Sequence, residues 1–313
     1  MNEIEKAILA MRDVKASTLK VYMTNLRKLK ENVGGKKGLD FLKKREEVMN
    51  YLSNLKRATQ MTYLIAIRMA ILSMNKNNKL DNLLEYYYEE FLKRKKETDE
   101  ERGKNEKTTK QEENWVTMQE LREVMDNYGK KIKNNKLAKK DELNKKEMDL
   151  VQKWLVTNLY LHDANPPVRL DYTPMSVITE QEYEAGVNQD KNYLVIKSRN
   201  NKYFIFNNYK TKDSYGVKKI KVGSKLNTAI NLWLKYNKTG TLLINKEGNP
   251  MSSNHFSKYV MSTFAPTKKK IGASMLRHIY ISDKFEPLSK EKQEVAEKML
   301  HSVSEQGVYA KDD

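Results

Sequence analysis

A highly charged segment divides this chain into two parts that must fold around separate cores. Residues 93–113 contain no large apolar side chain, and most of them are Lys, Arg, Asp or Glu. A stretch of this composition cannot bury enough apolar surface to fold by itself. We therefore expect a linker at residues 96–113 between two domains, at residues 1–95 and 114–313, and the length of 313 residues allows a core in each.

The first part shows the apolar spacing of amphipathic helices. Thr18 or Ser17 can cap a helix in which apolar residues recur every three or four positions, and three further stripes of this kind follow. Four such helices with short connections form a bundle. The four stripes are Leu19, Tyr22, Leu26 and Leu29; Val48, Tyr51, Leu52 and Leu55; Tyr63, Ile67, Ala70, Ile71 and Met74; and Leu80, Leu83, Leu84, Tyr87 and Phe91.

The charge balance favours a polyanionic partner. The chain has 59 Lys and Arg against 41 Asp and Glu, a net charge of +18, and nucleic acid is the commonest partner of so basic a protein. The candidate DNA contacts in the bundle are Lys20, Arg27, Arg57 and Arg68. For each of them, a solvated helix face is an equally good interpretation.

The second part combines helices with a small sheet. Alternating apolar residues predict three consecutive antiparallel strands at 193–196, 203–206 and 217–222, and Asp213–Gly216 provides turn residues between the last two. Apolar spacing predicts helices before and after these strands. The expected fold class is mixed α/β and mostly α: a helical bundle followed by an α+β domain with a small antiparallel sheet.

Several classes of protein are disfavoured by what the sequence lacks. There is no cysteine, hence no disulfide framework or thiolate metal site, and no apolar run approaches the ~18 residues of a membrane span. The start of the chain lacks the features of a signal peptide, so we expect a soluble, intracellular protein without a membrane partner. Nucleotide-binding glycine loops and His-Glu-x-x-His are absent, and no cofactor is expected. The carboxylates Asp163, Asp171, Glu180 and Glu182 show no recognisable metal-site spacing.

Five residues of the second part form an ordered set suited to phosphoryl transfer from DNA. They are Arg169, Lys210, Arg277, His301 and Tyr309. Such a transfer needs cations around the phosphate, a proton donor for the leaving oxygen and a nucleophile. Arg277 is the strongest single residue, because it lies among apolar neighbours where an arginine without an anionic partner would be costly. Taken one at a time, the other four match ordinary surface or core residues.

The order and context of these residues resemble the tyrosine recombinase, or phage integrase, family. The resemblance covers nearly the whole chain and rests on Val168–Asp171, Asn208–Thr211, Ser274–His278, and Met299–Ser302 with Tyr309 eight residues after His301. It implies a core-binding bundle, a catalytic domain and double-stranded DNA as partner, with Lys212 as a close rival of Lys210. The Lys/Asn-rich composition and Leu276–Tyr280 look most like integrases of large DNA viruses and virophages, whose targets lie in a viral factory or host nucleus.

The roles implied for the five residues follow the chemistry. Arg169 and Arg277 would clamp the non-bridging phosphate oxygens, and Lys210 would protonate the leaving 5′-hydroxyl. Tyr309 would attack phosphorus and form a 3′-phosphotyrosine that stores the bond energy for rejoining. His301 would bind the phosphate or help to manage the proton of Tyr309. The function expected is site-specific DNA recombination or integration.

The chain departs from the family pattern in three ways. Ser274 stands where the second motif usually has His, the spacing from His301 to Tyr309 is one residue short, and only four residues follow Tyr309. We expect a monomer in free solution and a higher oligomer, normally a tetramer, on paired target sites. Two alternatives stay open: a type IB topoisomerase that relaxes supercoiled DNA, and a DNA-binding protein that has lost catalysis.

Overall fold

The chain forms two compact units, each with its own apolar core. The computed structural model describes residues 2–35, 37–103, 106–162 and 167–298. The units are Met1–Lys107 and Thr108–Asp313, so the boundary falls inside the charged segment. Within the described ranges, no helix has the length and apolar character that crossing a membrane would need.

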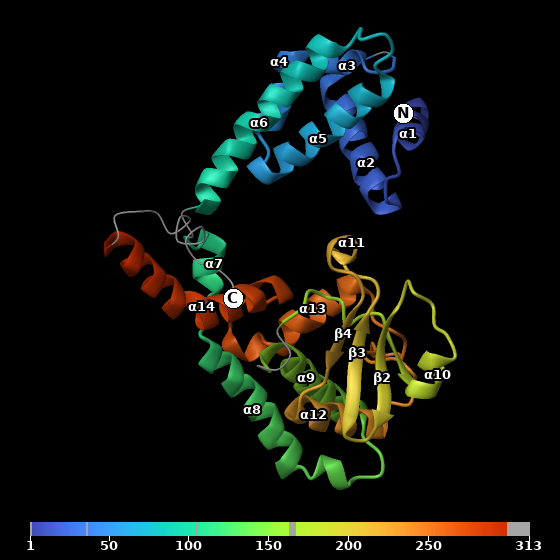
Figure 1. Cartoon of the computed structure of the whole chain (residues 1–313), viewed down its shortest axis with the longest axis vertical. Helices are drawn as coiled ribbons and strands as arrows, with labels where there is room; N and C mark the ends of the chain where they lie inside the picture. The colour runs from blue at the N-terminus through green and yellow to red at the C-terminus, as the bar shows by residue number, and fades with distance from the viewer. Residues whose placement is uncertain (1, 36, 104–105, 163–166, 299–313) are drawn as a thin grey trace, which may run out of the picture. The chain divides into compact units, whose positions relative to one another are not determined.

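The first unit is entirely helical among its described residues. The predicted apolar stripes form its core, in which Leu26, Leu29, Leu64 and Ile67 are fully buried. An additional helix, α1, joins them through its buried Ile4 and Ile8. The helices are α1 (Asn2–Met11), α2 (Ala16–Val33), α3 (Asp40–Lys43), α4 (Arg45–Ser53), α5 (Arg57–Met74) and α6 (Asp81–Gly103), as Figure 1 shows.

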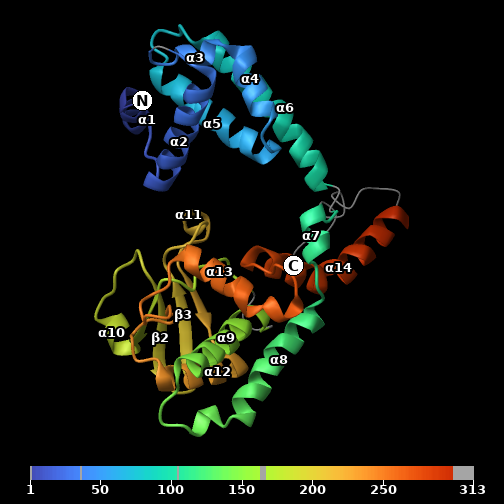
Figure 2. The same cartoon turned by 180° about the vertical axis from the view of Figure 1, so that it is seen from behind.

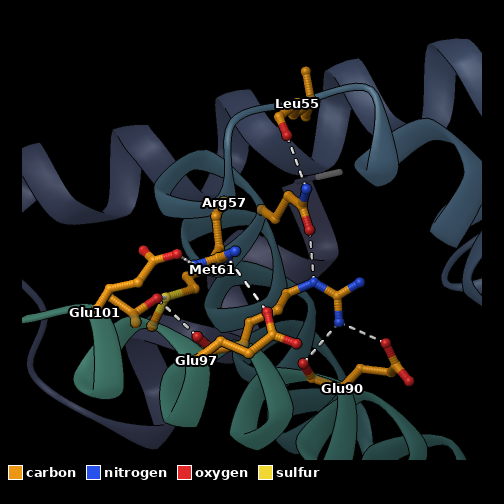
Figure 3. A network of polar contacts seen from close by, with 9 residues as sticks. Leu55, Arg57, Met61, Glu90, Glu97 and Glu101 are labelled. Carbon is orange, nitrogen blue, oxygen red and sulfur yellow. Dashed lines mark hydrogen bonds and ion pairs between the residues drawn. The ribbon is translucent and has the colours of Figure 1, made fainter. Parts of the chain in front are cut away.

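The charged segment is more ordered than its composition predicts. Helix α6 continues through it to Gly103, and α7 (Thr109–Asn114) forms beyond it, so the expected linker at 96–113 is largely helical. Polar contacts with α5 replace the missing apolar ones (Figure 3): Arg57 pairs with Glu97 at 3.4 Å and with Glu101 at 2.5 Å. Arg94 Nε donates to Gln60 at 2.6 Å. Straight-chain charged residues are also good helix formers, which favours continuation of α6.

The second unit begins with helices whose starts are well capped. Thr108, Thr117 and Asn144 each form a capping box, with Gln111, Glu120 and Glu147 as the reciprocal partners. The helices are α7, α8 (Met118–Asn134), α9 (Lys145–Leu161), α10 (Glu180–Glu184), α11 (Lys212–Tyr215), α12 (Ser224–Tyr236), α13 (Ser253–Thr263) and α14 (Ala273–Lys298), with short 3-10 turns η1 (Leu137–Lys139) and η2 (Ala265–Thr267).

The sheet has four strands in the order β1-β2-β3-β4. They are β1 (Met175–Thr179), β2 (Asn192–Ser198), β3 (Asn201–Phe206) and β4 (Lys218–Lys221). The three predicted strands are antiparallel, but β1 was not predicted and pairs parallel with β2, so the sheet is mixed and not purely antiparallel. The predicted fold class, mostly α with a small sheet in the second part, is confirmed.

Apolar side chains cover both faces of this sheet. Leu194, Phe204 and Phe206 face the main core, which also contains buried residues of α9 and α12. Tyr193, Val195, Tyr203 and Ile205 face the other side, where Tyr183 of α10 packs against them. The views from front and back both place α10 on one side of the sheet and α9 and α12 on the other (Figures 1 and 2).

Candidate active site

Arg169 lies in a turn that buried tyrosines hold in place. The Tyr160 hydroxyl, on α9, donates to the Arg169 carbonyl at 2.5 Å. Tyr172 is buried and its ring contacts Tyr160 edge-on at 5.9 Å between centroids. Further along, the Thr173 hydroxyl donates to the Met251 carbonyl at 2.5 Å. The backbone around Arg169 is thus fixed, while its half-buried side chain belongs to a turn at the edge of the core.

A buried amide joins this turn to the segment that carries Lys210. Asn192, at the start of β2, is 6% exposed. Its Nδ2 donates to the carbonyls of Asp171 at 3.0 Å and Asn208 at 2.9 Å, and its Oδ1 accepts from the Asn208 amide N–H at 2.8 Å. Asn192 therefore brings two of the predicted motifs, far apart in sequence, to one end of the sheet.

Lys210 lies two residues beyond this junction. It is exposed, in the connection between β3 and β4, which are the second and third of the three strands predicted. Lys212 begins the short helix α11 and is half-buried. Lys210 is the nearer of the two lysines in sequence to Asn208, which Asn192 joins to the Arg169 turn. The approach of either lysine side chain to Arg169 stays a prediction.

Arg277 lies in the first two turns of α14, among buried apolar residues. Met275, Leu276, Ile279 and Tyr280 are all buried. The Nε atom of Arg277 is also buried, and in the described part of the chain it has no hydrogen-bond partner. A buried cationic donor left unpaired is costly, so an anionic partner is expected at this position.

The charges of Arg169 and Arg277 both act on the carboxyl group of Asp171. Burial raises the pKa of Asp171, and the nearby Arg169 and Arg277 oppose that rise. Burial also raises the pKa of Tyr160 well above its usual value, with Arg277 among the charges that oppose it. Arg169 and Arg277 thus lie near enough to Asp171 for both charges to act on it, and we refer to these three residues as the charge cluster; the Asp171 carbonyl also accepts the hydrogen bond from Asn192. An anion entering this cluster would meet two guanidinium groups and one carboxyl group.

The structure does not place every member of the ordered set. His301 and Tyr309 lie outside the described residues, so their positions relative to the arginines stay predictions. Ser274 is exposed in the first turn of α14, three residues before Arg277. Residues at this spacing lie on the same side of a helix. A serine hydroxyl there is able to donate a hydrogen bond to an anion bound by Arg277.

The four basic candidates of the first unit divide into two pairs. Lys20 and Arg27 are exposed on α2. Arg57 is engaged with Glu97 and Glu101, and Arg68 lies over the rings of Tyr88 at 4.1 Å and Phe91 at 5.6 Å. These contacts give Arg57 and Arg68 a role in joining α5 to α6, whereas Lys20 and Arg27 have the exposure that a phosphate contact needs.

The acidic residues do not assemble into a metal site among the residues described. No group of three or more His, Asp or Glu side chains gathers there in a way that could hold a metal ion. Glu180 pairs with Lys197 at 3.0 Å, and Glu182 closes the capping box of α10 with Thr179. Asp163 lies outside the described residues.

The Asn192 junction gives a prediction for stability and activity together. Asn192→Ala would leave the amide N–H of Asn208 and two carbonyls without their partner, at a cost of about 1–3 kcal/mol in the free energy of unfolding. It should also weaken any activity that needs the Arg169 turn and the Lys210 segment together, because the two segments lose their link. Chemical denaturation and activity assays would measure both effects. Asn200→Ala, in the exposed β2–β3 turn, is the control; equal behaviour of the two variants would contradict the assignment.

Comparison with known proteins adds one distant structural likeness. No family model matches the chain, and no curated protein matches it. Among solved structures, the chain is similar to the crystal structure of XerA recombinase, with a TM-score of 0.33 and 8% sequence identity over 99% of this chain and 94% of that chain.

Proposed function

We propose that this protein is a site-specific DNA strand-exchange enzyme of the tyrosine recombinase type. The observation that carries the proposal is the buried Nε of Arg277, which has no hydrogen-bond partner within the described ranges, on an arginine whose charge acts on Asp171 together with that of Arg169. Asn192 links the charge cluster to the segment that carries Lys210. We propose that Arg169 and Arg277 clamp one phosphate group of DNA and that Lys210 serves the same phosphate; the Asn192 hydrogen bonds, which join the backbone segments of Arg169 and Lys210, support this.

The proposed reaction conserves the bond energy of the phosphodiester. The Tyr309 oxygen attacks phosphorus and loses its proton, while the bond from phosphorus to the 5′-oxygen breaks. Lys210 gives the departing 5′-oxygen a proton, and Arg169 and Arg277 hold the non-bridging oxygens as negative charge gathers on them. His301 contacts the phosphate or receives the Tyr309 proton. Reversal of these steps with a new 5′-hydroxyl rejoins the DNA.

Broader features of the proposal rest on the sequence. The net charge of +18 and the exposed Lys20 and Arg27 suit binding to duplex DNA by both units. We propose a monomer in free solution and a tetramer on paired sites, acting wherever the target DNA lies. The likeness of Leu276–Tyr280 to viral and virophage integrases makes integration of a viral genome the proposed biological use.

The proposal predicts covalent capture of DNA without a divalent metal ion. An Arg/Lys/His/Tyr site needs no metal, whereas a carboxylate site does. Suitable probes are nicked duplexes that carry the repeats flanking the gene, because the nick lets the 5′-hydroxyl strand diffuse away and traps the adduct. A protein–DNA band that forms in excess EDTA and survives denaturation is the expected result. An adduct or cleavage product that appears only with a divalent ion would contradict the proposal.

A further inference from the structure

The most exposed large aromatic side chain among the described residues lies on the same connection as Lys210. Tyr215, the last residue of α11, is 64% exposed, and Val217, just after it, is 48% exposed. Figures 1 and 2 both show α11 beyond the end of β3 and β4. Exposed apolar residues gathered at one tip offer a small apolar surface to a partner.

Internal hydrogen bonds hold this tip in one conformation. The amide of Tyr215 donates to the Thr211 carbonyl at 3.1 Å, and the amide of Gly216 donates to the Lys212 carbonyl at 2.7 Å. The ring of Tyr209 packs against the main core, and its hydroxyl donates to the Gly216 carbonyl at 2.6 Å. Gly216 ends α11 at a φ of 64°, in the left-handed region that favours glycine. Tyr215 is therefore held outward by an anchored backbone.

Positive charge surrounds the tip. Residues 207–221 contain five lysines and one acidic residue, Asp213. The ammonium group of Lys218 lies 5.7 Å from the centroid of the Tyr215 ring. Lys210, which precedes α11 in the sequence, is exposed. An apolar tip flanked by lysines suits a partner whose anionic backbone lies next to apolar surfaces. Duplex DNA has both, because its stacked bases lie between phosphate chains.

We infer that Tyr215, together with Val217, contacts the bases of duplex DNA beside the phosphate that Lys210 serves. This inference rests on the proposed function and deepens it. The lysines hold the phosphates on each side, and the Tyr215 ring enters the groove and packs against or between the bases. Such a contact reads the deformability of the base step, so Tyr215 is a specificity-determining residue for the choice of cleavage position.

Photocrosslinking tests the contact directly. The full-length chain is bound to a mixed-sequence duplex in which 5-iodouracil replaces thymine, irradiated, and digested with trypsin. The peptide Asp213–Lys218 contains one aromatic residue, Tyr215, so a crosslink in this peptide identifies the contact. A crosslinked chain in which this peptide stays unmodified would overturn the inference and leave DNA binding intact. Absence of any duplex binding would overturn the proposed function as well. A single-stranded RNA with 5-iodouracil that captures the same peptide in preference to the duplex would assign the tip to RNA instead.

The binding of three variants separates base contact from charge. Tyr215→Ala should weaken duplex binding by about 5- to 100-fold, while Tyr215→Phe keeps the ring and the affinity. Lys218→Ala should reduce the slope of log affinity against log salt by about 0.9, a change that Tyr215→Ala should not produce. Thermal melting of Tyr215→Ala should match that of the parent chain, because the side chain is exposed. Equal affinity of Tyr215→Ala and the parent chain would overturn the inference.

Discussion

Tyr309→Phe should abolish the covalent protein–DNA adduct and leave DNA binding unchanged. The substitution removes only the phenolic oxygen, which the proposed reaction uses as its nucleophile. Because the arginines and Lys210 remain, the variant keeps its cationic site and its affinity for duplex DNA. Gel separation under denaturing conditions measures the adduct, and a filter or mobility assay measures binding.

The control for this variant is a tyrosine elsewhere in the same part of the chain. Tyr280 lies on α14, three residues after Arg277, and its side chain is buried. Tyr280→Phe preserves the ring that packs in the core and should still form the adduct. If Tyr309→Phe formed an adduct and Tyr280→Phe did not, the nucleophile would be Tyr280 and the proposed role of Tyr309 would be wrong.

Arg277→Ala should lower the rate of DNA cleavage by about 10²- to 10³-fold, the loss that follows removal of one preorganised donor to a developing charge. Arg277→Lys keeps the charge but loses the bidentate geometry, so partial activity is expected. Single-turnover cleavage at saturating protein measures the rate. Lys284→Ala, an exposed substitution on the same helix, should leave the rate unchanged.

The stability of Arg277→Ala distinguishes a site residue from a structural one. The buried Nε has no hydrogen-bond partner among the described residues, so its removal relieves a cost that offsets the lost attraction to Asp171, and the unfolding temperature should change little. Residues kept for function at the expense of stability behave in this way. A variant that unfolds at a clearly lower temperature and keeps its cleavage rate would show that Arg277 serves the fold.

Periodicity predicted the longer helices of the first unit because their apolar faces repeat within a few residues, whereas α1 was missed and α11 forms where only a turn was expected. Strand β1 was missed for a contrasting reason: only Met175 of its five residues is buried, and its partner strand β2 follows after a helix. The ordering of residues 96–103 was missed because it depends on Arg57, which lies on another helix. Both β1 and the ordering of residues 96–103 depend on contacts between segments distant in sequence, which local composition does not reveal.

The site was predictable to the extent that its residues have distinctive chemistry. Arg277 could be singled out because a charged residue stood among apolar ones, and its buried Nε has no hydrogen-bond partner in the ranges that the structure describes; its role stays a prediction. Asn192 could not be identified from the sequence, because an asparagine at the start of a strand is common. Its three hydrogen bonds reach segments 16 and 21 residues away. Asp171 was noted only as a carboxylate, and its nearness to the charges of both arginines depends on folding.

The attachment point of DNA on the trapped protein tests the central claim most directly. After capture on a nicked duplex in excess EDTA, nuclease and tryptic digestion followed by mass spectrometry identifies the modified peptide. The tryptic peptide 299–311 contains one tyrosine, Tyr309. We expect a nucleotide joined through its 3′-phosphate to Tyr309 in that peptide. A nucleotide on any other peptide, or attachment through a 5′-phosphate, would contradict the account.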